Sequence, residues 1–416
     1  MLEGERKPPS MRIRSIDYLR GLCILVMIVT HVLSFWSTYD SLWLFIVEGI
    51  FFGSVGEVGF VLLSGIGFGF SWVKQRQAGV TTRDQILKSF SHTMILLIFS
   101  IGFNIGFSYL EKEEDFGFFP WMILQTLAIS RLLALLFTKV KKVPRLLIAL
   151  GVIAFGSLLL NWINFGKPLN PPDPLLDSLN TFLFVLLYQP LAYYPILVFF
   201  PFFLIGSVLG EDFGKVTINQ VKPAELVKQW LIIGLCLLAA GLLLGLQLEP
   251  RFPLVSQTPY NGRQLIEIIR RNPVLQITAY PLLLDLNSYA WSLFFSGLDI
   301  LLFLSFFRTL DVNPNKDINQ YSVKRNFLNL YGRYSLTIYL GHYALFLLPF
   351  ELDASILWLV DIGVVLLIYY VILQLDKIGN GKISIEFVIG VFGEWIYKKI
   401  KRIATKIPTN STESLL

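Results

Sequence analysis

The chain has 416 residues, of which 54% are hydrophobic and only 15% are charged. Soluble domains carry about 25% charged residues, so this composition excludes a soluble globular fold as well as a disordered chain. The net charge of +6 does not indicate nucleic-acid binding, because in a membrane chain the positions of the positive residues matter more. Cys23 and Cys236 both lie in apolar runs and form neither a disulfide framework nor a metal-ligand motif.

Ten apolar runs follow one another along the chain, and each is near or above the roughly 17–25 residues that a spanning helix needs. They cover residues 19–37, 43–72, 87–108, 119–138, 145–163, 192–210, 229–248, 290–307, 332–350 and 355–375. The sequence therefore predicts an all-α, polytopic membrane helix bundle with about ten transmembrane helices. A shorter apolar piece, Leu179–Leu187, is expected to be re-entrant or interfacial, with a spanning role left open.

Positive residues alternate between the connections and predict an orientation. Lys and Arg gather in the N-terminal arm, in every second connection (around 74–88, 139–145, 215–228 and 308–325) and in the tail 398–406. By the positive-inside rule, both termini are expected in the cytoplasm. The long connection 249–289 also carries Arg, but long loops cross regardless of charge. A short helix is expected within it, over Gly262–Arg271.

The same pattern divides the chain into three parts. Residues 1–18 form a cytoplasmic arm, residues 19–376 a single transmembrane domain, and residues 377–416 a cytoplasmic end. Ile383–Ile400 is too often interrupted by charge to span, and its pattern predicts an amphipathic helix on the cytoplasmic surface. The basic residues that follow either contact anionic lipid or form a solvated tail.

Ionisable side chains inside apolar runs are costly, so each is a candidate functional group. The candidates are Arg20, His31, Glu48, Glu57, Arg131, Asp299, His342 and Asp361. Helix-packing roles compete with functional ones at each position. His92, at the start of the third run, is expected at the interface.

The first helix carries the most specific arrangement of these groups. Arg20 and His31 are eleven residues apart, about three turns, so both point to one face with roughly 16 Å between them. Asp17 is three residues before Arg20, within pairing distance on a helix. An imidazole deep in the bilayer can act as a general base near neutral pH, or it can bond a neighbouring helix. His342 lies at a similar depth in its own run, so the two imidazoles could share a site.

The second run is rich in small residues, among them Gly49, Gly53, Gly65 and Gly69. The Gly49-x-x-x-Gly53 spacing lets another helix approach closely. The alternative is a helix that leaves room for a long, thin ligand.

Five segments, spaced in order along residues 12–350, together resemble the motifs of one protein family. They are Arg14-Ser-Ile-Asp17-Tyr-Leu-Arg20-Gly21 continuing to His31, Gly59-Phe-Val-Leu-Leu-Ser64-Gly65-Ile, Ile123-Leu-Gln125-Thr-Leu-Ala128, Tyr194-Pro-Ile through Gly210, and Leu330-Tyr-Gly332-Arg333-Tyr-Ser335-Leu336 through His342. Together they resemble the heparan-α-glucosaminide N-acetyltransferase-like family of transmembrane acyltransferases, which is related to the acyltransferase-3 proteins. In this resemblance His31 matches the catalytic histidine, and Arg20 matches the polar position before it.

The resemblance implies an acyl-CoA-dependent transmembrane acyltransferase. Acetyl or another acyl group would pass from cytosolic acyl-CoA to a hydroxyl or amine, on a sugar or glycoconjugate, at or across the membrane. His31 would be the general base, with Asp17 and His342 as supporting groups. Arg20, Arg333, Arg131 and Ser335 would bind the coenzyme, and no metal is expected. Direct attack is favoured over an acyl-histidine intermediate, since one base suffices for a thioester.

The expected partners are acyl-CoA, the acceptor and membrane lipids, with no nucleic acid and with a homodimer left open. A prokaryotic chain would reside in the plasma membrane. The alternative function is a proton-coupled secondary transporter or flippase, in which His31, Glu57, Asp299 and His342 form a proton relay. The absence of a visible internal repeat weighs against that alternative.

Overall fold

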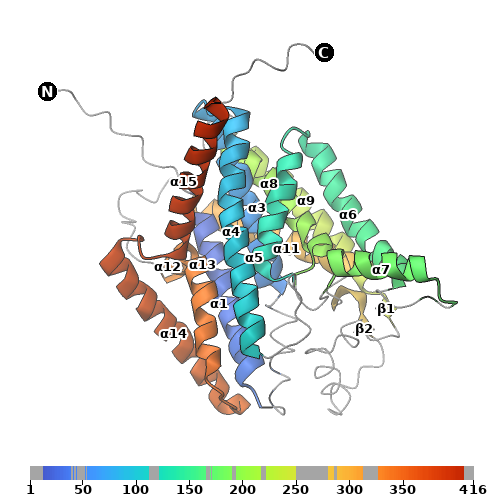
Figure 1. Ribbon diagram of the computed structural model, residues 1–416. Coiled ribbons are helices and arrows are strands. Elements are labelled where there is room, and N and C mark those ends of the chain that lie inside the picture. The colour runs from blue at the N-terminus through green and yellow to red at the C-terminus, as the bar shows by residue number, and fades with distance from the viewer. Residues whose placement is uncertain are drawn as a thin grey trace.

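The protein is described by a computed structural model over residues 13–38, 41, 44, 52, 54–111, 121–164, 169, 171–189, 194–216, 222–249, 280–284, 288–312 and 327–406. Over these residues the fold is a bundle of α-helices (Figure 1). Two short strands, β1 (Leu248–Glu249) and β2 (Tyr280–Pro281), pair antiparallel at one end of the bundle. The expected helix at Gly262–Arg271 and the candidate Glu48 lie outside the described residues. The predicted all-α class is confirmed.

Eight helices of the described chain are long and apolar enough to cross a membrane. They are α1 (Arg14–Trp36), α3 (Ser54–Gln77), α4 (Thr82–Glu111), α6 (Lys142–Trp162), α8 (Ile196–Val216), α9 (Pro223–Gly245), α11 (Tyr289–Leu310) and α14 (Ala354–Gly379). Each corresponds to one of the ten predicted runs. The protein is therefore a multi-pass integral membrane protein.

The other two predicted spans form shorter helices. The run 119–138 gives α5 (Ile123–Leu136), whose 14 residues reach about 21 Å, less than the roughly 30 Å hydrocarbon core. The run 332–350 is interrupted at Tyr334, which separates α12 (Phe327–Arg333) from α13 (Ser335–Gly341) and the 3-10 helix η6 (His342–Leu347). Eight full-length candidates rather than ten are thus found in the described part of the chain.

The short apolar piece near residue 180 forms the helix α7 (Pro174–Leu187). Asp173 caps it by accepting hydrogen bonds from the N–H groups of Leu175 and Leu176, and Pro174 occupies the first turn, where no N–H is needed. Most of its side chains are exposed, and it lies across the direction of α4 and α5 (Figure 1). Whether this helix is re-entrant, interfacial or spanning stays a prediction.

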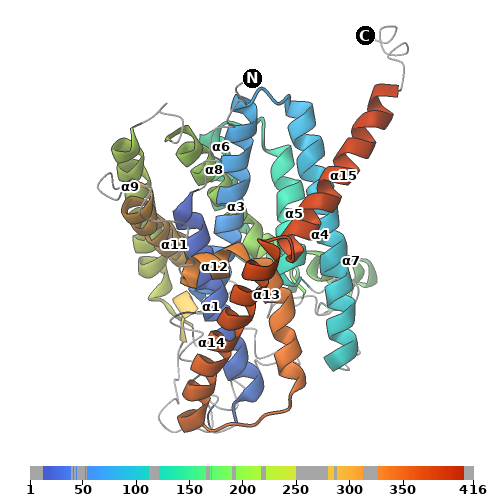
Figure 2. The same cartoon turned by 90° about the vertical axis from the view of Figure 1, so that its left-hand side faces the viewer.

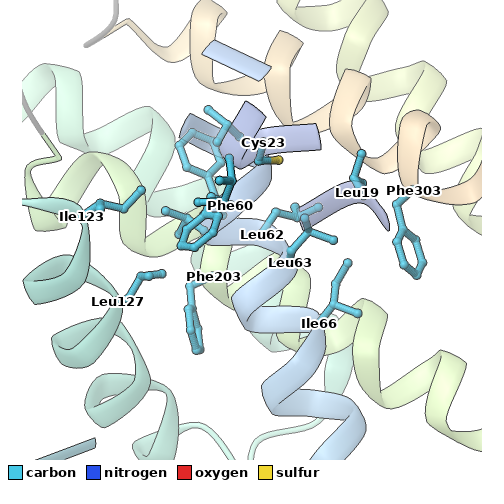
Figure 3. Packing of buried hydrophobic residues seen from close by; sticks show 14 of the residues in the cluster. Leu19, Cys23, Phe60, Leu62, Leu63, Ile66, Ile123, Leu127, Phe203 and Phe303 are labelled. Carbon is cyan, nitrogen blue, oxygen red and sulfur yellow. The ribbon is translucent and has the colours of Figure 1, made fainter. Parts of the chain in front are cut away.

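The centre of the bundle is the crossing of α3 and α8. A Cβ atom at Gly65 or Gly69 would collide with the α8 backbone, and one at Gly206 or Gly210 would collide with the α3 backbone. The two backbones therefore touch, and large side chains around them close the core (Figure 3). These glycines serve helix packing, whereas Gly49 and Gly53 lie outside the described residues.

A second close crossing joins α1 to α12. A Cβ atom at Gly21 would meet the Leu328 carbonyl oxygen, and one at Gly332 would meet the Asp17 carbonyl oxygen. The N-terminus of α1 is also capped by the Asp311 carboxylate, which accepts hydrogen bonds from the backbone N–H groups of Arg14 and Ser15 at 2.9 and 3.0 Å. These contacts fix α1, the helix that carries His31.

The predicted amphipathic helix is present as α15 (Ile385–Lys406). It packs alongside α4 (Figures 1 and 2), with ion pairs of 2.8 Å from Lys88 to Glu394 and 3.0 Å from Lys401 to Asp84. Its far end lies at the same end of the bundle as the α3–α4 and α5–α6 connections (Figure 1). The cytoplasmic placement of this end stays a prediction.

Candidate functional site

His31 lies on α1 where that helix meets η6. Its Nδ1 is 2.7 Å from the Met27 carbonyl oxygen, and because a carbonyl only accepts, Nδ1 carries the proton. Its Nε2 is 3.1 Å from the hydroxyl oxygen of Tyr343, so this nitrogen accepts the Tyr343 O–H. A basic lone pair is thereby held at a defined position within the membrane bundle.

His342 lies next to His31, as the similar depth in the sequence predicted. The centres of the two rings are 5.0 Å apart in an edge-on arrangement. His342 Nδ1 donates to the Ile338 carbonyl oxygen at 3.0 Å, and the side chain is buried. Its Nε2 has no hydrogen-bond partner among the described residues. Both imidazoles therefore carry their proton on Nδ1, and each directs Nε2 away from the carbonyl group that Nδ1 contacts.

Aromatic rings surround this pair. Tyr343 packs edge-on against His31 at 5.3 Å and lies 4.3 Å from His342, measured between ring centres. Phe35 and Phe346 stack on each other at 4.7 Å beside His31. These rings keep the imidazoles in an apolar environment and leave them few alternative orientations.

A cavity begins at His31 and follows α1 toward its N-terminus. The empty space between its walls is about 440 Å³ when the part open to the outside is counted, and its α1 wall runs from Cys23 to His31. That stretch of helix is about 12 Å long. The opposite walls come from α3, α5, the segment before α8, and α13. The lining is mainly apolar, and its polar groups are Thr30, His31, Glu57, Tyr194 and Tyr339.

Asp17 and Arg20 lie on α1 beyond the Cys23 end of the cavity. Because α1 is continuous from Arg14 to Trp36, the predicted three-turn separation of Arg20 and His31 is present. The Arg20 guanidinium reaches α3, where Nη2 lies 3.7 Å from the position of a Cβ built on Gly67. Asp17 is buried at the crossing with α12. The structure thus places Arg20 on the same helix as His31 but one turn beyond the Cys23 end of the cavity, whose lining does not include Arg20.

The other predicted coenzyme-binding residues are distributed over other helices. Arg131 lies over the ring of Phe68, one residue along α3 from the Arg20 contact, and its Nε donates to Ser89 Oγ at 3.1 Å. Arg333 is 3.5 Å from Asp376 and is therefore engaged with α14. Ser335 is buried at the start of α13. Arg20 and Arg131 share a level of the bundle, whereas Arg333 and Ser335 belong to the break between α12 and α13.

The predicted acids do not form one cluster with the histidines. Glu57 lines the cavity, but Asp299 lies behind its wall, next to Gly59 and Cys23. Both carboxyl oxygens of Asp299 are buried with no hydrogen-bond partner in the described residues. Asp361 is buried on α14. His92 packs against Gly393 of α15, and its placement at the membrane interface stays a prediction.

The comparison with protein families decides what this site belongs to. The family described as heparan-α-glucosaminide N-acetyltransferase, catalytic, matches residues 12–244, more than half of the chain. The chain belongs to this family. A search of the curated proteins found no match. The predicted family resemblance is confirmed.

Membership of the heparan-α-glucosaminide N-acetyltransferase family establishes the general chemistry. The family consists of membrane acetyltransferases that use acetyl-CoA. Asp17, Arg20, His31 and Arg131 fall inside the matched region, whereas His342 and Tyr343 fall outside it. The histidine pair is therefore assembled from a matched helix and a segment nearly a hundred residues beyond the match.

Sequence analysis missed Tyr343 and Tyr339 in this acetyltransferase-family chain. Tyr343 bonds His31, and Tyr339 lines the cavity one turn earlier. The available signal was their position beside His342, at spacings that bring all three to one side of a helix. It was obscured because tyrosine is also a common packing residue near membrane interfaces.

Proposed function

We propose that this protein transfers the acetyl group of acetyl-CoA to an amine or hydroxyl of a sugar or glycoconjugate, with His31 as the general base. The observation that supports this most directly is the cavity that runs along α1 from Cys23 to His31. It is narrow, mostly apolar and ends at an imidazole whose Nε2 is directed toward another side chain rather than its own helix. Such a space suits a pantetheine arm carrying a thioester.

The coenzyme would enter from the side on which Arg20 lies. Arg20 and Arg131 approach two consecutive residues of α3, Gly67 and Phe68, and would pair with the phosphates of the coenzyme. The roughly 16 Å from Arg20 to His31 is the distance that the arm must bridge. Arg333 and Ser335 would serve the same end of the coenzyme only after Arg333 exchanged its contact with Asp376.

The chemistry follows from the two tautomers. The acceptor N–H or O–H would replace the Tyr343 hydroxyl at His31 Nε2, and Nε2 would take its proton as the acceptor attacks the thioester carbonyl. Collapse of the tetrahedral intermediate breaks the carbon–sulfur bond, and the leaving thiolate takes the proton back from the imidazolium. His342 would keep His31 oriented and offer its own Nε2 to the acceptor. Direct attack needs no acyl-enzyme.

The first test measures binding and transfer separately. A ligand that binds only the folded state raises apparent stability by about 2.7 kcal/mol at a hundred times its Kd. Acetyl-CoA is expected to stabilise the wild type and His31→Ala equally, and Arg20→Ala less. His31→Ala should lower kcat by roughly 10²- to 10⁴-fold in a radiolabelled acetyl transfer assay with a glucosamine-ended acceptor. Substantial turnover by His31→Ala would remove it from the base role.

A proton-coupled transporter remains the second candidate because Asp299 is a buried acid without a partner among the described residues. It would use Asp299 and Glu57 together with the histidine pair. The discriminating result is the absence of any stabilisation by millimolar acetyl-CoA or longer acyl-CoAs. Proton uptake by reconstituted vesicles, abolished in Asp299→Asn, would then support transport.

The arrangement in the membrane is part of the proposal. Both termini would face the cytoplasm, which places Arg20 and the nearby Cys23 end of the cavity on the side of acetyl-CoA. The transmembrane domain 19–376 would hold the site. The outer face of α15, with exposed Phe387, Phe392 and Trp395 followed by Lys398 and Lys399, would contact the inner leaflet and its anionic headgroups.

A further inference from the structure

The break between α12 and α13 creates a local problem in hydrogen bonding. A helix that starts inside a bundle leaves its first N–H groups without partners in the helix itself. At the start of α13 the N–H groups of Leu336 and Thr337 are in this position, one and a half turns before His342. These half-buried N–H groups therefore need acceptors from another part of the protein.

Glu386 of α15 supplies the missing acceptors. Its Oε1 accepts from the N–H of Leu336 at 2.7 Å and from that of Thr337 at 3.2 Å, and its Oε2 accepts from the Thr337 hydroxyl at 2.5 Å. The Thr337 hydroxyl in turn accepts from the N–H of Ile385 at 2.9 Å. The N-termini of two helices are thus joined by a reciprocal cap, and the carboxylate also complements the α13 dipole.

The other end of α13 leads into the histidine site. His342 is oriented by its bond to Ile338 on α13, and Tyr343 follows immediately and bonds His31. A small rotation or shift of α13 would therefore change both groups that contact His31. Misplacement by about 1 Å costs catalysis roughly 10²-fold in other enzymes.

We propose that Glu386 is a positioning residue, which sets α13 so that His342 and Tyr343 meet His31. The C-terminal helix α15, which lies outside the region matched by the family, is then part of the acetyl-transfer machinery. The inference rests on the proposed function for its effect on activity, but the geometric coupling from Glu386 to the imidazoles can be observed without turnover.

The test uses the fact that the chain has three histidines. Histidine labelled with ¹⁵N in the full-length protein gives separate signals for His31 and His342 in the site and for His92, which packs against Gly393 of α15. Glu386→Ala is expected to shift the His31 and His342 signals and leave His92 unchanged, because Lys88 and Asp84 still hold α15. In the transfer assay kcat should fall by roughly 10- to 100-fold with the KM for acetyl-CoA unchanged.

Two further variants make the result specific. Glu386→Gln keeps a carbonyl oxygen for the two N–H groups, so it should restore the wild-type imidazole signals and most of kcat. Glu394→Gln is the matched control on the same helix, and it should move the His92 signal alone. If Glu386→Ala does not fold, Thr337→Val removes the hydroxyl from the same cap and should give the same shifts with a smaller loss of kcat.

The outcomes are distinguishable. Wild-type His31 and His342 signals in both Glu386→Ala and Thr337→Val would overturn the positioning role. Shifted signals in a protein whose wild type does not transfer acetyl groups would retain the coupling and reject the proposed function. A loss of kcat that Glu386→Gln does not restore would also contradict the inference, because the cap geometry would then not be what matters.

Discussion

The α3–α8 crossing and the contact between α1 and η6 differ in how closely their helices pack. At the crossing, four glycines let the backbones of α3 and α8 touch. At the contact with η6, two imidazoles and a tyrosine hydroxyl meet beside a cavity. The crossing leaves no room between the two backbones, whereas the contact with η6 borders the cavity beside His31.

The difference shows which contacts fix the geometry of each region. The crossing depends on the absence of side chains, so any added atom must displace backbone. The histidine site depends on the hydrogen bonds of His31 to Met27 and of His342 to Ile338. It also depends on Glu386, which caps α13, the helix that leads to His342. A rigid glycine-packed core therefore supports a site whose geometry is set by polar contacts at its edge.

The largest expected effect comes from adding one methyl group to the crossing. Gly206→Ala places a Cβ against the Leu62 carbonyl oxygen on α3, and neither backbone can move without the other. Overpacking of this kind costs about 1–3 kcal/mol of stability. Gly102→Ala is the matched control, because a Cβ there meets nothing within 4 Å. Thermal unfolding in detergent should separate the two variants, and equal stabilities would show that the crossing tolerates expansion.

A smaller effect is expected from the polar side of the comparison. Tyr343→Phe retains the ring contacts with His31 and His342 but removes the hydroxyl that meets Nε2. One neutral hydrogen bond is worth about 0.5–1.5 kcal/mol, and the acceptor must replace this one at Nε2, so kcat/KM for the acceptor should rise by up to roughly tenfold. Affinity for acetyl-CoA should not change, since Tyr343 is remote from Arg20. A calorimetric titration beside the transfer assay checks both statements, and a weakened affinity would place Tyr343 on the coenzyme path instead.

The sequence predicted the relative positions of residues correctly where they lie on one continuous helix. Arg20 and His31 could be placed on one face because α1 is unbroken, and both lie inside the region that the family matches. The depth of His342 was also predictable, since its run begins near Arg333. Eight of the expected spans were found because their apolar runs are long enough to determine a helix on length alone.

The sequence was less informative where tertiary contacts decide. Nothing in the run 332–350 indicates that Tyr334 ends one helix and starts another, because the break is supported by partners on α14 and α15. Tyr334 donates to Asp376 at 2.8 Å, and Glu386 caps the next helix. For the same reason the sequence does not distinguish Glu386 from the other charges of the amphipathic stretch 383–400.

The smallest effect concerns α15 and pH. The hydrogen bond from Lys88 lowers the pKa of the Glu394 carboxyl below its usual range, so this contact favours the docked helix above the ordinary glutamate value of about 4.3. It is lost as the pH falls through the lowered pKa. The α3–α8 crossing contains no titrating pair in its glycine contacts and should stay folded in that range. Acidification toward pH 3 is therefore expected to increase hydrogen exchange in α15 around Glu394 before it does so in α8, and Glu394→Gln should show this local increase already at neutral pH, with the Glu386 cap intact. Simultaneous exchange of both helices would mean that α15 is held mainly by its apolar face and by Glu386, and that the ion pairs to α4 contribute little.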